Sequence, residues 1–91
     1  MTEVQKQLNR LRIGQRIAEI RKKKGLSMRE LAELTGLNHS NIGKIELGKY
    51  SVGVDILGRI CDALDVRLDI IEFSNEPNKK ISYETRKRTL A

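Results

Sequence analysis

The sequence predicts an all-α domain of four to five short helices around a helix-turn-helix, with a short C-terminal β-strand as the alternative for the last element. Aromatic residues make up only 3% of the 91 residues, so the core must be built from Ile, Leu and Val. A chain of this length can bury one modest core, and its apolar residues recur at helical intervals between glycines. Such a core favours helices packed on helices over a sandwich filled with large rings.

The first predicted helix runs through "IGQRIAEIRKKKG". Ile13, Ile17 and Ile20 have the i, i+4, i+7 spacing of one amphipathic stripe. The lysines that follow suit the negative end of the helix dipole, and Gly25 can terminate the helix.

Residues 1–11 continue this helical spacing and are predicted to be an N-terminal helical extension. Thr2 and Gln5 have the spacing of a capping box. Gly14 interrupts the pattern, so one long helix and a separate N-terminal turn are both compatible with the sequence.

The second helix has the clearest start signal, because Ser27 and Glu30 form a second capping-box pattern. Gly36 ends this helix after about two turns. Asn38 can cap a third helix, which Gly48 can close in the left-handed conformation. Two short helices joined by a glycine turn make a helix-turn-helix.

The residue types of this motif have physical reasons. Ala32 is small where the two helices cross, and Gly36 makes the turn without strain. Ile42 and Ile45 are predicted to face inward on the third helix. Helical periodicity then turns a set of polar side chains outward: His39, Ser40, Asn41 and Lys44.

The fourth predicted helix lies in "VGVDILGRICDALDV" and places four residues on one face: Leu57, Ile60, Cys61 and Leu64. Residues 67–73 are ambiguous. Their alternation and β-branched content favour a strand, whereas the spacing of Leu68 and Ile71 also allows a fifth helix. Residues 74–91 form a basic polar arm that holds the only proline.

Composition excludes several classes of protein. No apolar run approaches the roughly 20 residues of a membrane span, and the N-terminus lacks the apolar centre of a secretory signal. A lone Cys61 suits a reducing cytoplasm. One His and one Cys cannot supply a zinc site, and no nucleophile–base set is apparent. We therefore expect a cytoplasmic protein with no catalytic residue, metal or cofactor.

The charge is unevenly distributed. Residues 1–52 hold 11 Lys/Arg against 5 Asp/Glu, residues 53–73 hold 2 against 5, and residues 74–91 hold 5 against 2. Basic segments on both sides of the acidic residues 53–73 suggest that the protein has one surface that binds a polyanion and a separate surface with another role.

Residues 12–66 resemble the Cro/lambda-repressor-like (XRE) family of helix-turn-helix DNA-binding domains. The resemblance lies in the motif described above together with the helices before and after it. It implies a compact lambda-repressor-like fold that binds operator DNA as a dimer, with the third helix in the major groove. Residue by residue, it places base contacts at His39, Ser40, Asn41 and Lys44.

The resemblance also implies contacts to the DNA phosphates and one internal ion pair. The phosphate contacts would come from Ser27, Arg29, Asn38, Lys49 and Tyr50. The ion pair would join Arg21 to Glu46 and fix how the third helix projects, so Glu46 is expected to be structural.

Three positions depart from the family pattern: His39, Met28 and Val52, the last of which replaces a frequent proline. His39 stands where glutamine is frequent, so an adenine preference does not carry over. Met28 replaces a glutamine that touches the backbone, and Arg29 is its possible substitute. Lys44 could contact either guanine or a phosphate. Gly43 could allow closer approach to DNA or could simply weaken its helix.

These observations predict a double-stranded-DNA-binding transcriptional regulator, a repressor that acts as a homodimer on a pseudo-palindromic operator. An antitoxin that also neutralises a toxin partner is an alternative, and a protein-only interaction module is a third. The dimer interface is expected in the acidic C-terminal third, where a strand could pair with its two-fold copy. Its residues would be Leu68, Ile70, Ile71 and Phe73.

Overall fold

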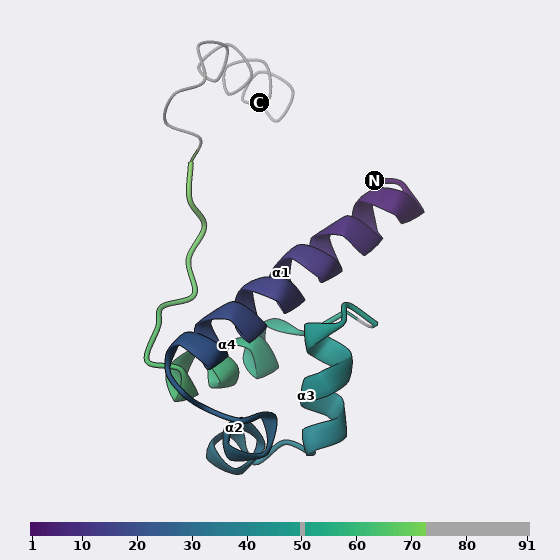
Figure 1. Ribbon diagram of the computed structural model, residues 1–91. Helices are drawn as coiled ribbons and strands as arrows, with labels where there is room; N and C mark the ends of the chain where they lie inside the picture. The colour runs from purple at the N-terminus through teal and green to yellow at the C-terminus, as the bar shows by residue number, and fades with distance from the viewer. Residues whose placement is uncertain (50, 73–91) are drawn as a thin grey trace.

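A computed structural model describes residues 1–49 and 51–72. This part of the chain forms the helices α1 (Glu3–Lys23), α2 (Met28–Thr35), α3 (His39–Glu46) and α4 (Val54–Ala63) (Figure 1). The C-terminal half of α1 packs with the three shorter helices, and its N-terminal half extends beyond them (Figure 1). The predicted all-α fold is confirmed.

Helix α1 is one continuous helix of 21 residues, so the N-terminal extension is not a separate turn. The predicted capping box starts it: Thr2 Oγ1 accepts from Gln5 N at 3.1 Å, and Gln5 Oε1 accepts from Thr2 N at 2.8 Å. Gly14 lies inside this helix and does not break it.

The shorter helices begin and end close to where local signals predict. Ser27 Oγ accepts from Glu30 N at 3.0 Å at the start of α2, and Asn38 Oδ1 accepts from Ser40 N at 2.8 Å at the start of α3. Glycines with positive φ follow the first three helices, at Gly25 (75°), Gly36 (74°) and Gly48 (70°). Left-handed backbone is accessible to glycine without a steric penalty, so these three predicted helix ends are confirmed.

The core lies between the four helices, each of which contributes buried side chains. Helix α3 packs against both α1 and α2, and α2 packs against α4. Among the described residues, the buried apolar side chains are Ile17, Leu31, Ala32, Ile42, Ile45, Ile60 and Leu64. On α4, Leu57 and Cys61 are half-buried beside this cluster. The core is therefore aliphatic, as the composition predicts.

Residues 66–72 form neither the fifth helix nor a strand in the described chain. Helix α4 stops because Asp65 takes a positive φ of 58°, and Val66 N donates back to Cys61 O at 2.9 Å. A strand also needs a partner, and the described part of the chain supplies none. The fifth helix, which the spacing allowed as the alternative, is therefore wrong over residues 67–72, and the favoured strand does not form among the described residues. Phe73 and the arm 74–91 lie outside the described residues.

Candidate nucleic-acid interface

The helix-turn-helix is held together at its turn by local bonds. Leu37 N donates to Ala32 O at 3.1 Å and to Thr35 Oγ1 at 3.3 Å, which closes the end of α2. The Thr35 hydroxyl is buried and donates to Leu31 O at 2.8 Å. Ala32 is 6% exposed. The small residue at the crossing and the glycine turn therefore do what the sequence predicted.

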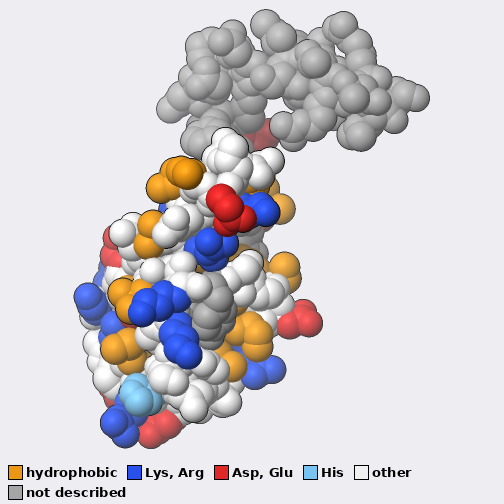
Figure 2. All heavy atoms as spheres, turned by 90° about the vertical axis from the view of Figure 1, so that its right-hand side faces the viewer, with side chains coloured by type: hydrophobic (Ala, Val, Ile, Leu, Met, Phe, Trp, Pro, Cys, Tyr) orange, Lys and Arg blue, Asp and Glu red, His pale blue; other side chains and the backbone are white. Residues whose placement is uncertain are grey.

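The inner and outer faces of α3 differ completely. Ile42 and Ile45 are 1% and 3% exposed and anchor the helix in the core. The four residues predicted to contact bases are all exposed on the other side: His39, Ser40, Asn41 and Lys44. Figure 2 shows this face, with the only histidine in pale blue near its lower end and blue Lys and Arg side chains above it. The structure thus brings the four predicted residues together on one exposed surface.

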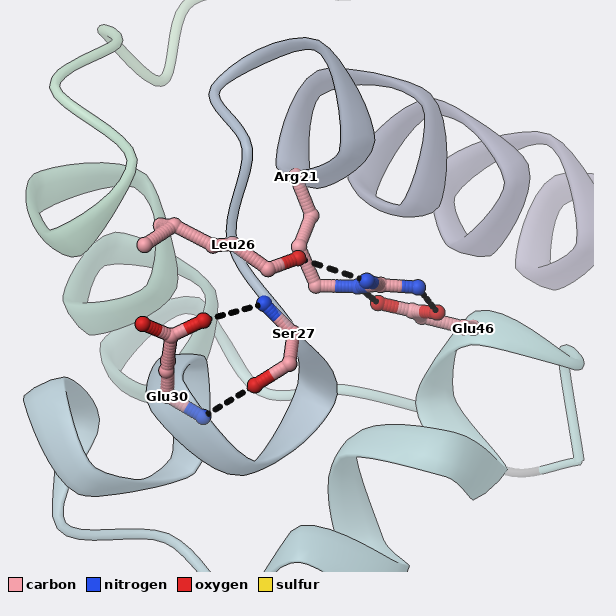
Figure 3. A network of polar contacts seen from close by, with 5 residues as sticks. All are labelled: Arg21, Leu26, Ser27, Glu30 and Glu46. Carbon is pink, nitrogen blue, oxygen red and sulfur yellow. Dashed lines mark hydrogen bonds and ion pairs between the residues drawn. The ribbon is translucent and has the colours of Figure 1, made fainter.

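A buried ion pair fixes the direction of α3. Arg21 Nε donates to Glu46 Oε2 at 2.7 Å, and its Nη2 donates to Glu46 Oε1 at 3.0 Å (Figure 3). The third nitrogen, Nη1, donates to Leu26 O at 2.8 Å, just before α2 begins. One guanidinium therefore joins α1, the start of α2 and the end of α3, with the planar two-bond geometry that arginine favours.

This environment keeps Arg21 charged. Its hydrogen bonds to Glu46 raise the pKa of the guanidinium above its already high ordinary value, while burial acts in the opposite direction. The side chains are 9% and 8% exposed, so solvent screens the pair only weakly. The ion pair implied by the family resemblance is formed, and its role here is structural.

Two glycines bring α1 and the end of α3 into unusually close contact. A Cβ added at Gly14 would lie 2.5 Å from Glu46 O and closer still to Ile45 O. A Cβ at Gly48 would lie 2.9 Å from Leu11 N. Sequence reasoning took Gly14 only as a possible helix break and missed this contact. The available signal was a glycine within an otherwise regular amphipathic helix.

The predicted phosphate contacts surround α3, although two of them also serve as caps. Ser27 and Asn38 accept bonds at their helix starts, which leaves the Ser27 hydroxyl proton and the Asn38 amide as donors toward solvent. Arg29 and Lys49 are exposed. Tyr50 lies outside the described residues. The start of α4, at Gly53, has no side-chain cap.

Met28 and Gly43 lie next to each other at the outer crossing of α2 and α3. The Met28 sulfur would be 3.7 Å from a Cβ added at Gly43, an ordinary van der Waals contact. The packing of these helices therefore does not require glycine at position 43. The two interpretations of Gly43, close approach to DNA and a tolerated weakening of the helix, both stay predictions.

Two further properties of the described residues bear on other kinds of site. These residues contain no group of three or more His, Cys, Asp and Glu that could hold a metal ion. None of their helices is both long and apolar enough to cross a membrane. At Cys61, partial burial and then the nearby Asp62 charge raise the pKa of the thiol, which disfavours its reactive thiolate form.

The fold and this interface define a helix-turn-helix protein, and comparison with known families agrees. A family model described as helix-turn-helix matches residues 17–71, more than half of the chain. The chain therefore belongs to this helix-turn-helix family.

Individual relatives are regulators of the same class. The chain is 42% identical over 66 residues to the HTH-type transcriptional regulator PuuR of Escherichia coli (strain K12), covering 72% of this chain and 35% of that protein. It is 38% identical over 68 residues to an uncharacterized HTH-type transcriptional regulator of Rickettsia prowazekii (strain Madrid E), covering 74% and 52%. The chain thus spans about a third to a half of the length of these relatives.

A solved structure is also similar. The restriction-modification controller protein C.AhdI from Aeromonas hydrophila superposes with a TM-score of 0.65 at 37% sequence identity. The match covers 66% of this chain and 91% of that one.

Proposed function

We propose that the chain is a sequence-specific, double-stranded-DNA-binding transcriptional regulator that acts as a repressor. The observation that carries the proposal is the surface of α3, whose polar side chains His39, Ser40, Asn41 and Lys44 lie opposite two buried isoleucines. Short polar side chains can approach base edges in the major groove. Arg21 and Glu46 hold this helix rigidly, so its side chains present a constant pattern to the DNA. Repression would follow from occupying an operator.

We propose that the regulator binds as a homodimer. Two recognition helices must lie about 34 Å apart to enter successive major grooves on one side of the duplex. The segment after α4 offers exposed apolar side chains for such an interface, with Ile70 at 96%, Ile71 at 86% and Leu68 at 43% exposed. Its excess of acidic residues keeps it away from the phosphates. We also propose a cytoplasmic location, because a lone cysteine suits a reducing compartment. The proposal assigns the chain no enzymatic activity, metal or cofactor.

Selection of random duplex DNA by the purified protein tests the proposal directly. We expect one recovered sequence with two-fold symmetry and half-sites about one helical turn apart. If each subunit neutralises roughly 4–6 phosphates, the log–log salt slope of a dimer should be about −7 to −11. Absence of binding at low salt, or a slope near zero, would contradict DNA binding and favour a protein-only module.

Two lysine variants separate base recognition from general DNA affinity. Lys44→Ala should weaken binding to the selected site by about 1–3 kcal/mol and relax the preference at one base position. Lys49→Ala should weaken binding to selected and random duplexes alike. For a dimer, which loses one phosphate contact in each subunit, the salt slope should become about 1.8 less steep. Equal losses on both duplexes for Lys44→Ala would make Lys44 a phosphate contact.

A further inference from the structure

A groove lies between the N-terminal half of α1 and the loop that follows α3. It is open to solvent and has a volume of about 410 Å³. Its lining residues are Met1, Lys6, Asn9, Arg10 and Ile13 on one side and Ser51 and Val52 on the other. The two sides meet where Gly48 packs against the backbone of Leu11. All of the α1 residues that line the groove precede residues 17–71, which match the helix-turn-helix family.

Met1, Ile13 and Val52 make much of the lining apolar, but both of its charged residues are basic, so a charged ligand held there would be an anion. Lys6 and Arg10 supply positive charge, Asn9 and Ser51 supply neutral donors, and no acidic residue is among the described residues that line it. Glu3 approaches Lys6 at 3.7 Å, but both side chains are well exposed, so their attraction is weak.

Arg10 has unused hydrogen-bonding capacity in this position. Its Nε is buried and has no hydrogen-bond partner. A buried N–H without an acceptor is unfavourable, so a modest rotation of the side chain toward an acceptor in the groove would be favoured.

The groove lies on the same side of the molecule as the surface of α3. In Figure 1 both α3 and the N-terminal end of α1 lie on the right, and that side faces the viewer in Figure 2. There the blue Lys and Arg side chains continue upward from the histidine across the face that the two helices share (Figure 2). Lys49, a predicted phosphate contact, is in the loop that borders the groove.

We infer that this groove binds a phosphate of the DNA backbone outside the bases that α3 contacts, so that the N-terminal half of α1 lengthens the footprint of each subunit. The inference rests on the proposed function. A helix rises about 1.5 Å per residue, so Lys6 lies about 10 Å along α1 from Ile13. This distance corresponds to about three base pairs of flanking duplex, at about 3.4 Å for each.

The test measures affinity on two duplexes that carry the selected site, one ending at its outer bases and one extended by six base pairs on each side. On the long duplex, Lys6→Gln and Arg10→Gln should each reduce affinity about threefold to tenfold. Each should also make the salt slope less steep, by about 0.9 for every phosphate that a subunit no longer neutralises. On the short duplex they should match the wild type.

Arg12→Gln is the matched control, because Arg12 is exposed on the same half of α1 and does not line the groove. Equal effects of all three variants on the long duplex would overturn the inference, as would a change of oligomeric state in Lys6→Gln measured by light scattering. Lys6 is exposed, so its variant decides the outcome even if Arg10→Gln fails to fold. Wild-type protein that binds neither duplex would contradict the proposed function itself, and this inference with it.

Discussion

Among single residues, Arg21 has the largest structural role. Its three guanidinium nitrogens all donate to protein acceptors, two on Glu46 and one on the Leu26 carbonyl. A buried charge is tolerated only when it is paired and hydrogen-bonded, and this arrangement meets both conditions. The same bonds orient the helix that carries the proposed base contacts.

Removing one partner of this pair should therefore be costly. Glu46→Ala leaves the Arg21 charge buried and should lower the free energy of unfolding by about 3–5 kcal/mol. Glu19→Ala, which breaks an exposed pair with Arg16 on α1, should lower it by less than about 1 kcal/mol. Urea unfolding of Glu46→Ala, Arg21→Ala and the double variant measures the coupling, with Glu19→Ala as the exposed control. Additive effects for Arg21 and Glu46 would mean that the pair does not act as a unit.

Glu30 gives the start of α2 a dependence on pH. The Ser27 backbone N–H, at 2.9 Å, and then the Ser27 hydroxyl lower the pKa of this carboxyl below its ordinary value. A lowered folded pKa means that the stabilisation is present above the ordinary value and is lost as pH falls through the folded one.

We therefore expect the stability advantage of the wild type over Glu30→Gln to be constant near neutrality and to shrink below about pH 4.3. Glutamine keeps the capping-box geometry, so the difference isolates the charge. Thermal melts across this pH range provide the measurement, with Glu33→Gln on the same helix as the control for net charge. An advantage that does not change with pH would contradict the role of the carboxylate.

Among the elements, α1 and α3 depend on each other through glycine. Because Gly14 has no side chain, the last carbonyl groups of α3 can pack against α1. Gly48, in the turn after α3, likewise packs against the backbone of Leu11 in α1. Backbone atoms cannot move aside as a flexible side chain can, so these contacts fix the distance between the two helices.

Two substitutions of the same kind should thus have opposite signs. Gly14→Ala should destabilise the protein by about 1–3 kcal/mol or more, because the new methyl group would overlap carbonyl groups of α3. Gly58→Ala, in α4, has open space around the added Cβ and should stabilise the protein by about 0.5–1 kcal/mol, because alanine favours the helix. Denaturant unfolding measures the free energy of unfolding of both variants. A stabilised Gly14→Ala variant would mean that α1 and α3 can move apart without loss of stability.

For the whole molecule, the balance of charge changes along the chain. The basic excess of residues 1–52, most of it on α1, contrasts with the acidic excess of residues 53–73. The apolar side chains Ile70 and Ile71 stand almost fully exposed beyond α4. Exposed apolar side chains of this kind often mark an interaction site, which agrees with a dimer whose DNA-binding surfaces face away from its interface.

Ile70→Pro tests this arrangement. Proline removes the backbone N–H and cannot join a strand ladder, so the variant should be monomeric and bind the operator more weakly. Ile70→Val keeps both the N–H and the β-branched side chain and should remain dimeric. Light scattering and operator titration give both readouts. An Ile70→Pro variant that is dimeric and binds normally would exclude a strand interface at this segment.

Much of the fold could be predicted because its signals are local. The capping residues Thr2, Ser27 and Asn38 bond to residues two or three positions away. The left-handed turn at Gly36 likewise depends on one residue and its neighbours. The exposed polar residues of α3 could be predicted once Ile42 and Ile45 were assigned to the core, because a helix has a fixed period.

The sequence by itself thus determined the ends of α2 and α3, the aliphatic core and the polar surface of α3. Only the tertiary structure decided that Gly14 is a contact with Glu46 rather than a break, and that the first half of α1 lines a groove with Ser51. It also decided that residues 66–72 add no helix to the described core. The physical reason is the range of the interactions. Capping and periodicity act within a few residues, whereas the contact of Gly14 and the groove join atoms more than thirty positions apart in the sequence. A strand over residues 67–72 would depend on a partner strand that the described chain does not supply.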